Sequence, residues 1–189
     1  MTKIGLCITG SFCTLKSILS AIDDLVARDF DITPIFSYNV STFDTRFFKQ
    51  AEFEKLVVEK TGKTPIKTIV DAEPFGTSKA VDLMLVAPCT GNTLAKIAYG
   101  ITDTPVTMAV KAHLRNNRPV VLSVSTNDAL GANAKNIGAL LNTKNIYFVP
   151  FGQDAPFKKF NSLVADTSLI VPTCDEALNG KQIQPIFTK

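Results

Sequence analysis

The chain contains a single histidine, His113, and no tryptophan. This scarcity excludes metal sites that need two imidazole ligands, and it leaves one residue for any histidine-based catalytic triad. The glycine-rich pattern GxGxxG is also absent, which argues against the usual mode of binding a dinucleotide such as NAD(P). We therefore expect no metal site and no autonomous nicotinamide chemistry.

Long hydrophobic runs and paired cysteines are missing as well. No apolar stretch approaches the roughly 18 residues of a membrane-spanning helix. The four cysteines form no CxxC pair and lie mostly in apolar segments, which is typical of reduced, buried thiols. The net charge of +3 is too small and too evenly spread for a nucleic-acid footprint. We expect a cytoplasmic protein that binds neither membrane nor nucleic acid.

What the sequence does contain is an alternation of short apolar runs with helical periodicity. The runs predict strands at residues 3–9, 31–36, 82–87, 119–124 and 146–149. Helices are predicted at residues 15–26, 44–60, 92–99, 104–117, 133–142 and 161–178, the last one broken or kinked by Pro172. A short extended piece is expected at 66–70 and a loop at 73–78. This alternation predicts an α/β fold with a parallel, doubly wound sheet, in a single domain spanning residues 1–189.

Ligands of doubly wound sheets bind beyond the carboxyl ends of the strands. The turns to search are therefore residues 10–11, 37–39, 88–92 and 123–127. In the first of them, Thr9-Gly10-Ser11 leads from a strand into a helix, whose free N–H groups and dipole favour a phosphate. The alternative is an ordinary turn in which Ser11 caps the helix.

The segment from Asp82 to Asp103 carries the most information. A buried strand runs into Pro88, which is expected to end the strand, and small polar residues follow at the start of a helix. Their hydroxyl and amide groups suit hydrogen bonds to a planar ligand with polar edges. The same residues also suit a plain strand, turn and helix cap, so both interpretations stay open.

Residues 87–103, APCTGNTLAKIAYGITD, match the pattern APxTxNTxAKxAxGxxD. The segment resembles the flavoprotein superfamily that contains flavin-dependent cysteine decarboxylases and flavin prenyltransferases. Within that superfamily, residues 106–152 resemble the B subunits of dipicolinate synthases, and the likeness covers nearly the whole chain.

This resemblance implies a three-layer, Rossmann-like sandwich of the flavodoxin type that binds FMN, often between the subunits of a homo-oligomer. Carried over by motif, one group of residues would hold the phosphate and ribityl chain: Thr9, Gly10, Ser11 and Ser37. A second group would line the isoalloxazine ring: Ala87, Pro88, Thr90, Asn92 and Thr93. A third group would close the other side of the site: Ser123, Ser125, Thr126 and Asn127.

The resemblance also implies a function. As a B subunit, the chain would act with a nicotinamide-binding A subunit that carries NADP, and the pair would oxidise dihydrodipicolinate to dipicolinate in the mother cell of a sporulating bacterium. The substrate is a small dicarboxylate, which basic side chains can bind. The candidates are Arg46, Lys49, Lys111, His113 and Arg115, although solvated charges and a partly buried histidine would look the same in the sequence.

The chain departs from the superfamily where acid or base chemistry is expected. It has no counterpart of the decarboxylase histidine, and Lys49 stands at the position of the prenyltransferase glutamate. We therefore assign no catalytic residue. Two other functions stay open: a non-catalytic scaffold of flavoprotein fold for the A subunit, and a stand-alone FMN-dependent decarboxylase or prenyltransferase.

Overall fold

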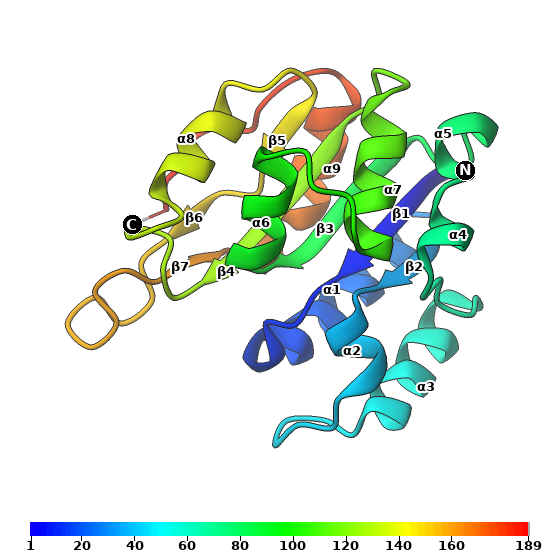
Figure 1. The fold of residues 1–189 in the computed structure, drawn as a ribbon, viewed down its shortest axis with the longest axis horizontal. Coiled ribbons are helices and arrows are strands. Elements are labelled where there is room, and N and C mark those ends of the chain that lie inside the picture. The colour runs from blue at the N-terminus through cyan, green and yellow to red at the C-terminus, as the bar shows by residue number, and fades with distance from the viewer. Residues whose placement is uncertain (189) are drawn as a thin grey trace.

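A sheet of seven strands forms the centre of the protein in the computed structural model, which describes residues 1–188 (Figure 1). Five strands are parallel and lie side by side in the order β2 (Phe30–Phe36), β1 (Thr2–Ile8), β3 (Leu83–Cys89), β4 (Val120–Thr126) and β5 (Ile146–Phe148). The order 2-1-3-4-5 is that of doubly wound sheets of the flavodoxin type. The predicted fold class is confirmed.

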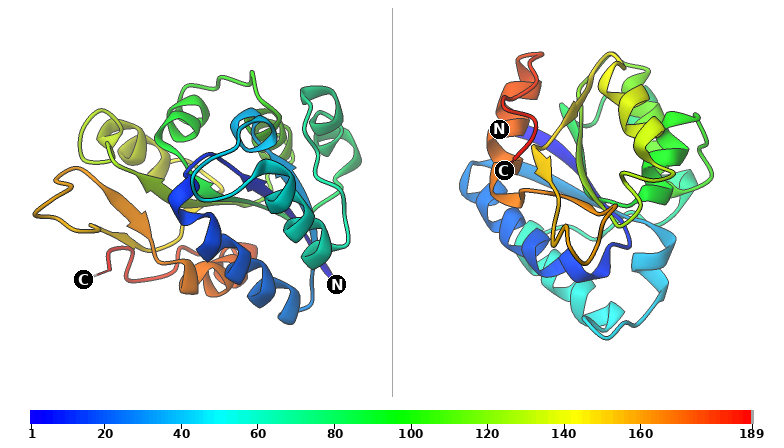
Figure 2. Two further views of the ribbon diagram at one scale, coloured as in Figure 1. Left: turned by 90° about the horizontal axis from the view of Figure 1, so that it is seen from below. Right: turned by 90° about the vertical axis from the view of Figure 1, so that its left-hand side faces the viewer.

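Helices cover both faces of this sheet (Figure 2). One face carries α1 (Leu15–Ala27), which follows the 3-10 turn η1 (Phe12–Thr14), and α9 (Ile170–Leu178), which follows η2 (Thr167–Leu169). The other face carries α6 (Gly91–Ala98), α7 (Pro105–Leu114) and α8 (Ala134–Leu141). Every residue of β3 is buried, as expected for a strand covered by helices on both sides.

Four further helices connect β2 to β3: α2 (Tyr38–Thr42), α3 (Gln50–Thr61), α4 (Ile69–Ala72) and α5 (Phe75–Ser78). The prediction of one helix over residues 44–60 was wrong at its start. Asp44 accepts a hydrogen bond from the backbone of Gln50 at 2.9 Å, so the chain turns before α3 begins. The extended piece expected at 66–70 is confirmed only at its start, where Ile66 forms a parallel bridge with Ile35, because α4 begins at Ile69. The loop expected at 73–78 was wrong in its second part, where α5 forms. Stretches this short carry too little periodicity to be recognised.

An antiparallel hairpin extends the sheet beyond β4. Its strands are β6 (Phe151–Gly152) and β7 (Leu163–Ala165), and β7 also pairs with β4, opposing Val164 to Ser125. The connecting residues, 153–162, project from the body of the molecule at the left of Figure 1 and are called the hairpin loop below.

The prediction of a helix over residues 161–178 was therefore wrong in its first half. Asp166 accepts a hydrogen bond from the backbone of Ser168 at 3.0 Å, and this cap starts a new helical turn after β7. Pro172 does not break the helix, because it lies in the first turn of α9, where a missing N–H is tolerated. Pro88 does not end its strand either, since β3 continues to Cys89 after a shift of register.

The core is continuous across the sheet, and its largest buried side chains include Phe36, Phe53, Phe148 and Phe151. Cys7, Cys89 and Cys174 belong to it, whereas Cys13 is exposed. Among residues 1–188, no helix has both the length and the apolar character needed to cross a membrane.

Candidate functional site

A cavity of about 670 Å³ lies where β1, β3 and β4 end. This is within the usual size range of pockets for small ligands and cofactors. Its wall is built by the turn after β1, the start of α6, the end of β4, the loop between α2 and α3, and the hairpin. The lining residues are Gly10, Ser11, Phe12, Cys13, Arg46, Phe47, Thr90, Gly91, Asn92, Ser125, Thr126, Asn127, Asp128, Asp154, Lys159, Ser162 and Val164.

Hydroxyl groups tie the three strand ends together. The buried Thr9 hydroxyl donates to the carbonyl oxygen of Pro88 at 2.6 Å and accepts from the backbone N–H of Thr90 at 3.0 Å. The hydroxyl oxygens of Ser11 and Ser125 lie 2.8 Å apart. These contacts join turns that are far apart in the sequence, so the part of the wall at the strand ends is held together by hydrogen bonds.

A polar cluster closes the cavity wall at the start of α6. Asp128 accepts hydrogen bonds from the hydroxyl of Thr126 and from Asn133, whose amide nitrogen lies 2.7 Å away, and Asn136 in turn donates to Asn133 at 2.8 Å. Gly91 packs directly on this cluster. A Cβ at Gly91 would lie 2.6 Å from atoms of Thr126, Asp128 and Asn133, so only glycine fits there.

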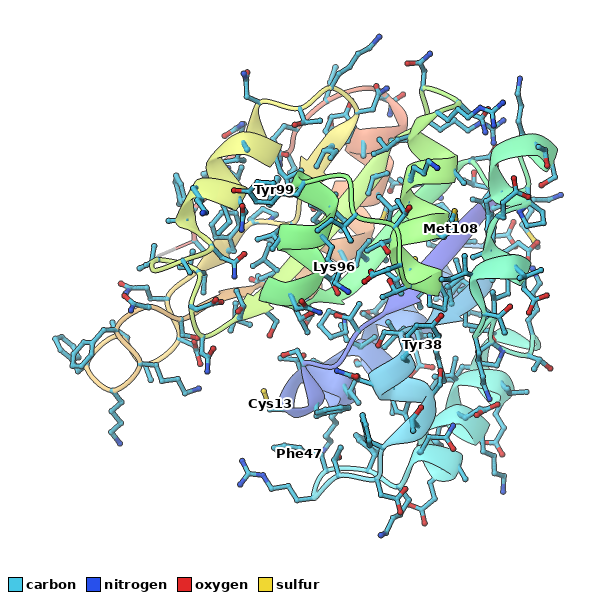
Figure 3. All side chains as sticks on the ribbon, in the orientation of Figure 1. Cys13, Tyr38, Phe47, Lys96, Tyr99 and Met108 are labelled. Carbon is cyan, nitrogen blue, oxygen red and sulfur yellow. The ribbon has the colours of Figure 1, made fainter. Side chains whose placement is uncertain are left out.

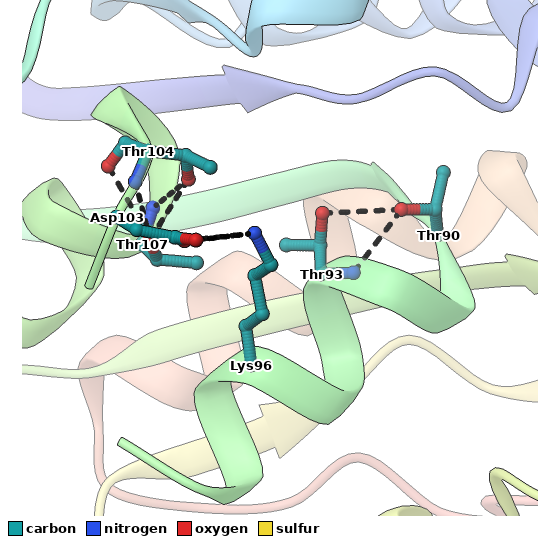
Figure 4. Close-up of polar contacts among 6 residues, drawn as sticks. All are labelled: Thr90, Thr93, Lys96, Asp103, Thr104 and Thr107. Carbon is teal, nitrogen blue, oxygen red and sulfur yellow. Dashed lines mark hydrogen bonds and ion pairs between the residues drawn. The ribbon is translucent and has the colours of Figure 1, made fainter. Parts of the chain in front are cut away.

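The rest of the 87–103 motif holds α6 against α7 (Figure 4). Thr90 caps α6 by accepting from the backbone N–H of Thr93 at 3.3 Å, and their hydroxyl oxygens lie 3.1 Å apart. Lys96 forms an ion pair with Asp103 at 2.8 Å, which ties α6 to the segment that leads into α7. Thr93, Lys96 and Asp103 therefore shape the site from behind, outside the lining.

Seven of the thirteen predicted cofactor residues line the cavity: Gly10, Ser11, Thr90, Asn92, Ser125, Thr126 and Asn127. The other six do not: Thr9, Ser37, Ala87, Pro88, Thr93 and Ser123. Five of these are buried behind the wall, where they support it. The sixth, Ser37, caps α2, and its hydroxyl accepts from the backbone N–H of Val40 at 3.4 Å.

Only one of the five predicted substrate residues, Arg46, lines the cavity. Lys49, Lys111 and Arg115 are exposed elsewhere. His113 is 1% exposed in α7, and its Nε2 lies 3.1 Å from the carbonyl oxygen of Pro119. Burial lowers the pKa of His113 to about 4, so the ring is neutral at pH 7, and it takes no part in forming the cavity.

Nine lining residues escaped the predicted site: Phe12, Cys13, Phe47, Gly91, Asp128, Asp154, Lys159, Ser162 and Val164. Figure 3 shows Cys13 and Phe47 on neighbouring segments at one end of the molecule. Phe12 and Cys13 directly follow the Gly10-Ser11 turn, and Asp128 follows Asn127. Their position next to predicted site residues was therefore the one signal in the sequence that could have identified them. Asp154, Lys159, Ser162 and Val164 come from the unpredicted hairpin.

The two charged residues that the hairpin contributes to the lining, Asp154 and Lys159, neutralise each other. Lys159 Nζ lies 2.5 Å from Asp154, which also accepts from the hydroxyl of Ser162. Although partial burial works in the opposite direction, these contacts hold the pKa of Asp154 below its usual value. The same hydrogen bond raises the pKa of Lys159. Both groups are therefore ionised at pH 7.

The comparison with family models decides the affiliation of the chain. Residues 1–169 match the model named Flavoprotein. The chain belongs to the Flavoprotein family. The resemblance stated from the 87–103 motif is thereby confirmed, and the cavity of this flavoprotein includes several residues of that motif.

Named relatives narrow this affiliation. The flavoprotein is 48% identical over 187 residues to the B subunit of dipicolinate synthase from Bacillus subtilis (strain 168), covering 99% of this chain and 94% of that protein. It is similar to the crystal structure of the dipicolinate synthase B subunit from Bacillus halodurans C, with a TM-score of 0.91 and 44% identity over 100% of this chain and 96% of that one.

A solved structure of much lower sequence identity has a similar fold. The FMN-dependent cysteine decarboxylase SpaF has a TM-score of 0.70 and 18% identity to this flavoprotein, over 95% of this chain and 97% of that one. At this level of identity the likeness concerns the fold alone.

Proposed function

We propose that this flavoprotein is the B subunit of a dipicolinate synthase. Together with a nicotinamide-binding A subunit that carries NADP, it oxidises dihydrodipicolinate to dipicolinate in a sporulating bacterium. The observation that carries the proposal is the 48% identity to a dipicolinate synthase B subunit over nearly the whole of both chains. The cavity supports a role in ligand binding over that of a bare scaffold, since its wall is rich in hydrogen-bonding groups.

The lining suits FMN as the cofactor. Hydroxyl and amide groups of Ser11, Thr90, Asn92, Ser125 and Asn127 can bond the polar edges of a flavin. A Cβ at Gly10 would lie 3.3 Å from both Asn39 and Phe12, so the glycine keeps this turn narrow. The residues therefore fit the group.

The phosphate of FMN is assigned to the turn at Gly10 and Ser11. The other candidate is the start of α6, where free N–H groups also favour an anion. There, however, Oδ1 of Asp128 would lie 2.6 Å from a Cβ at Gly91. The Asp128 carboxylate already interacts favourably with the positive end of the α6 dipole, and its negative charge would repel a phosphate. The ring system then extends from the turn toward Thr90 and Asn92.

The proposed reaction removes two hydrogens and makes the substrate ring aromatic. One hydrogen leaves as a hydride to an acceptor and the other as a proton, and bound flavin would supply a two-electron acceptor in the cavity. This chain's residues enclose the substrate, orient it and offer carboxylates. Asp128 and Asp154 are the carboxylates of the lining, whereas buried His113 is outside it.

Reconstitution from the two purified proteins tests the function. The chain is mixed with a dipicolinate synthase A subunit, NADP and dihydrodipicolinate, and dipicolinate is measured by its ultraviolet absorbance. We expect product at full rate only when both proteins are present. Full turnover by this chain alone with NADP would contradict the division of labour, and no turnover by the pair would contradict the function itself.

A cavity variant separates a catalytic role from that of a scaffold. If Asn92→Asp loses FMN and the pair then loses its rate, the cavity takes part in the reaction. If the pair keeps its full rate with FMN removed, the chain is the scaffold of the alternative hypothesis. Decarboxylase or prenyltransferase activity of the chain alone would support the third possibility and contradict the proposal.

A further inference from the structure

Four charged side chains line the cavity, and three of them have partners. Asp154 and Lys159 form an ion pair, and Asp128 accepts from Thr126 and Asn133. Arg46 differs, because no carboxylate among residues 1–188 lies within 4 Å of its guanidinium group. Two lining charges are therefore without an ion-pair partner, the carboxylate of Asp128 and the guanidinium of Arg46. Of the two, Arg46 is the group that favours an anionic ligand.

The loop that bears Arg46 is held by hydrogen bonds. The hydroxyl oxygen of Thr45 accepts from the backbone N–H groups of Phe47 and Phe48, both at 3.2 Å, and the N–H of Thr45 donates to the carbonyl oxygen of Phe48 at 2.9 Å. The ring of Phe48 lies 5.4 Å from that of Phe53, which is in the core. This turn presents Arg46 to the cavity from a defined position.

The guanidinium group of Arg46 also packs on an aromatic ring. Its central carbon lies 4.8 Å from the centre of the Phe47 ring, and Phe47 itself lines the cavity. Stacking on an aromatic face leaves the N–H groups in the guanidinium plane available, and their fork matches a carboxylate. Lys49, three residues further on, is in another situation: its ammonium group is paired with Asp44 at 3.1 Å.

We propose that Arg46 is the residue that recognises a carboxylate of the substrate, by a bidentate pair formed in the cavity. The inference rests on the proposed function, which makes both substrate and product small ring dicarboxylates. It adds the specificity-determining residue for that substrate. Arg46 is exposed, and its side chain contacts the exposed ring of Phe47 but makes no hydrogen bond within residues 1–188, so we expect its replacement to leave the fold intact.

Ligand binding to the isolated chain gives the first test. Dipicolinate and its uncharged diamide have the same ring and nearly the same shape, and the affinity for each is measured by calorimetry in metal-free buffer. We expect Arg46→Gln to weaken dipicolinate binding about 10- to 100-fold, as for the loss of a charged hydrogen-bonded pair, and to leave the diamide unaffected. Arg46→Lys keeps the charge but loses the forked guanidinium group, so its affinity for dipicolinate should lie between those of the wild type and Arg46→Gln.

Turnover gives the second test, with the reconstituted pair of proteins. We expect Arg46→Gln to raise KM for dihydrodipicolinate at least about 10-fold, with a smaller change in kcat, because a binding interaction is removed. Arg115→Gln is the matched control: Arg115 is exposed at the end of α7, outside the cavity lining. This variant should leave both constants unchanged.

The possible results distinguish a failure of the role inferred for Arg46 from a failure of the proposed function. Wild-type affinity and KM in Arg46→Gln, in an enzyme that works, would overturn the role of Arg46 and leave the function standing. A loss of FMN affinity larger than the loss for dipicolinate would also overturn it, since Arg46 would then serve the cofactor phosphate. If the wild-type pair neither binds dipicolinate nor turns over, the proposed function fails.

Discussion

The hydroxyl groups of Ser11 and Ser125 lie 2.8 Å apart, although 114 residues separate them in the chain. Ser11 follows β1 and Ser125 is near the end of β4, and the end of β3 lies between them in the sheet. Both residues line the cavity. Their contact shows that the cavity is assembled at the carboxyl edge of the sheet, where the order of the strands brings distant turns together.

The contact at Gly91 predicts a stability effect. Gly91→Ala puts a Cβ 2.6 Å from three polar atoms, so the cluster of Thr126, Asp128 and Asn133 must move. We expect a loss of about 1–3 kcal/mol in the free energy of unfolding, measured by urea denaturation. Gly138→Ala in α8 is the matched control, because no atom lies within 4 Å of the added Cβ. It should stabilise the protein by about 0.5–1 kcal/mol, and an equal loss in both variants would contradict the packing argument.

Asn92 predicts a binding effect without a stability effect. In Asn92→Asp an amide donor becomes a carboxylate on the cavity wall, so we expect FMN affinity, followed by flavin fluorescence, to fall at least about 10-fold. Stability should hold, because an acidic residue in the first turn of α6 interacts favourably with the helix dipole. Asn117→Asp, at an exposed turn outside the cavity lining, should bind FMN as the wild type does. Equal affinity in both variants would remove Asn92 from the site.

The burial of His113 predicts a pH dependence of stability. Its pKa is about 4 in the folded protein and 6.5 when unperturbed, so the unfolded chain binds more protons between these values. Stability contributed by the neutral ring is therefore present above pH 6.5 and is lost as the pH falls toward 4. Between pH 7 and pH 5 the wild type should lose about 2 kcal/mol more than His113→Gln, measured as the free energy of unfolding. Parallel curves for the two proteins would show that His113 is not the group responsible.

The cysteines predict a selective reaction with a thiol reagent. Burial raises the pKa of the Cys89 thiol to about 12 and raises the pKa values of Cys7 and Cys174 further above their usual range. Cys13 is exposed and lines the cavity. One thiol should therefore react quickly in the native protein, and saturating FMN should slow that reaction. Cys13→Ser should abolish the fast phase, and a fast phase that survives in this variant would contradict the assignment.

The sequence predicted the central strands because β3 and the first residues of β4, Val120 to Leu122, form apolar runs, which a strand buried on both faces requires. It also predicted the edge of the sheet where the cavity lies, since glycine and small polar residues follow those runs. The hairpin could not be predicted, because β6 has two residues and β7 has three. Asp154, Lys159 and Ser162 were therefore missing from the expected site.

The choice among basic residues was also beyond the sequence. Arg46 and Lys49 are three positions apart in one loop, yet only Arg46 lines the cavity, because hydrogen bonds of Thr45 and Asp44 set the path of the chain between them. Lys111 and Arg115 were expected near a substrate from residue type alone. The structure has both on the exposed side of α7.

A crystal structure of this chain grown with FMN tests the assignment of the cavity most directly. We expect electron density for the phosphate beside Gly10 and Ser11 and for the ring system beside Thr90 and Asn92. With saturating FMN, a cavity without flavin density, or flavin bound at another place on the molecule, would contradict it.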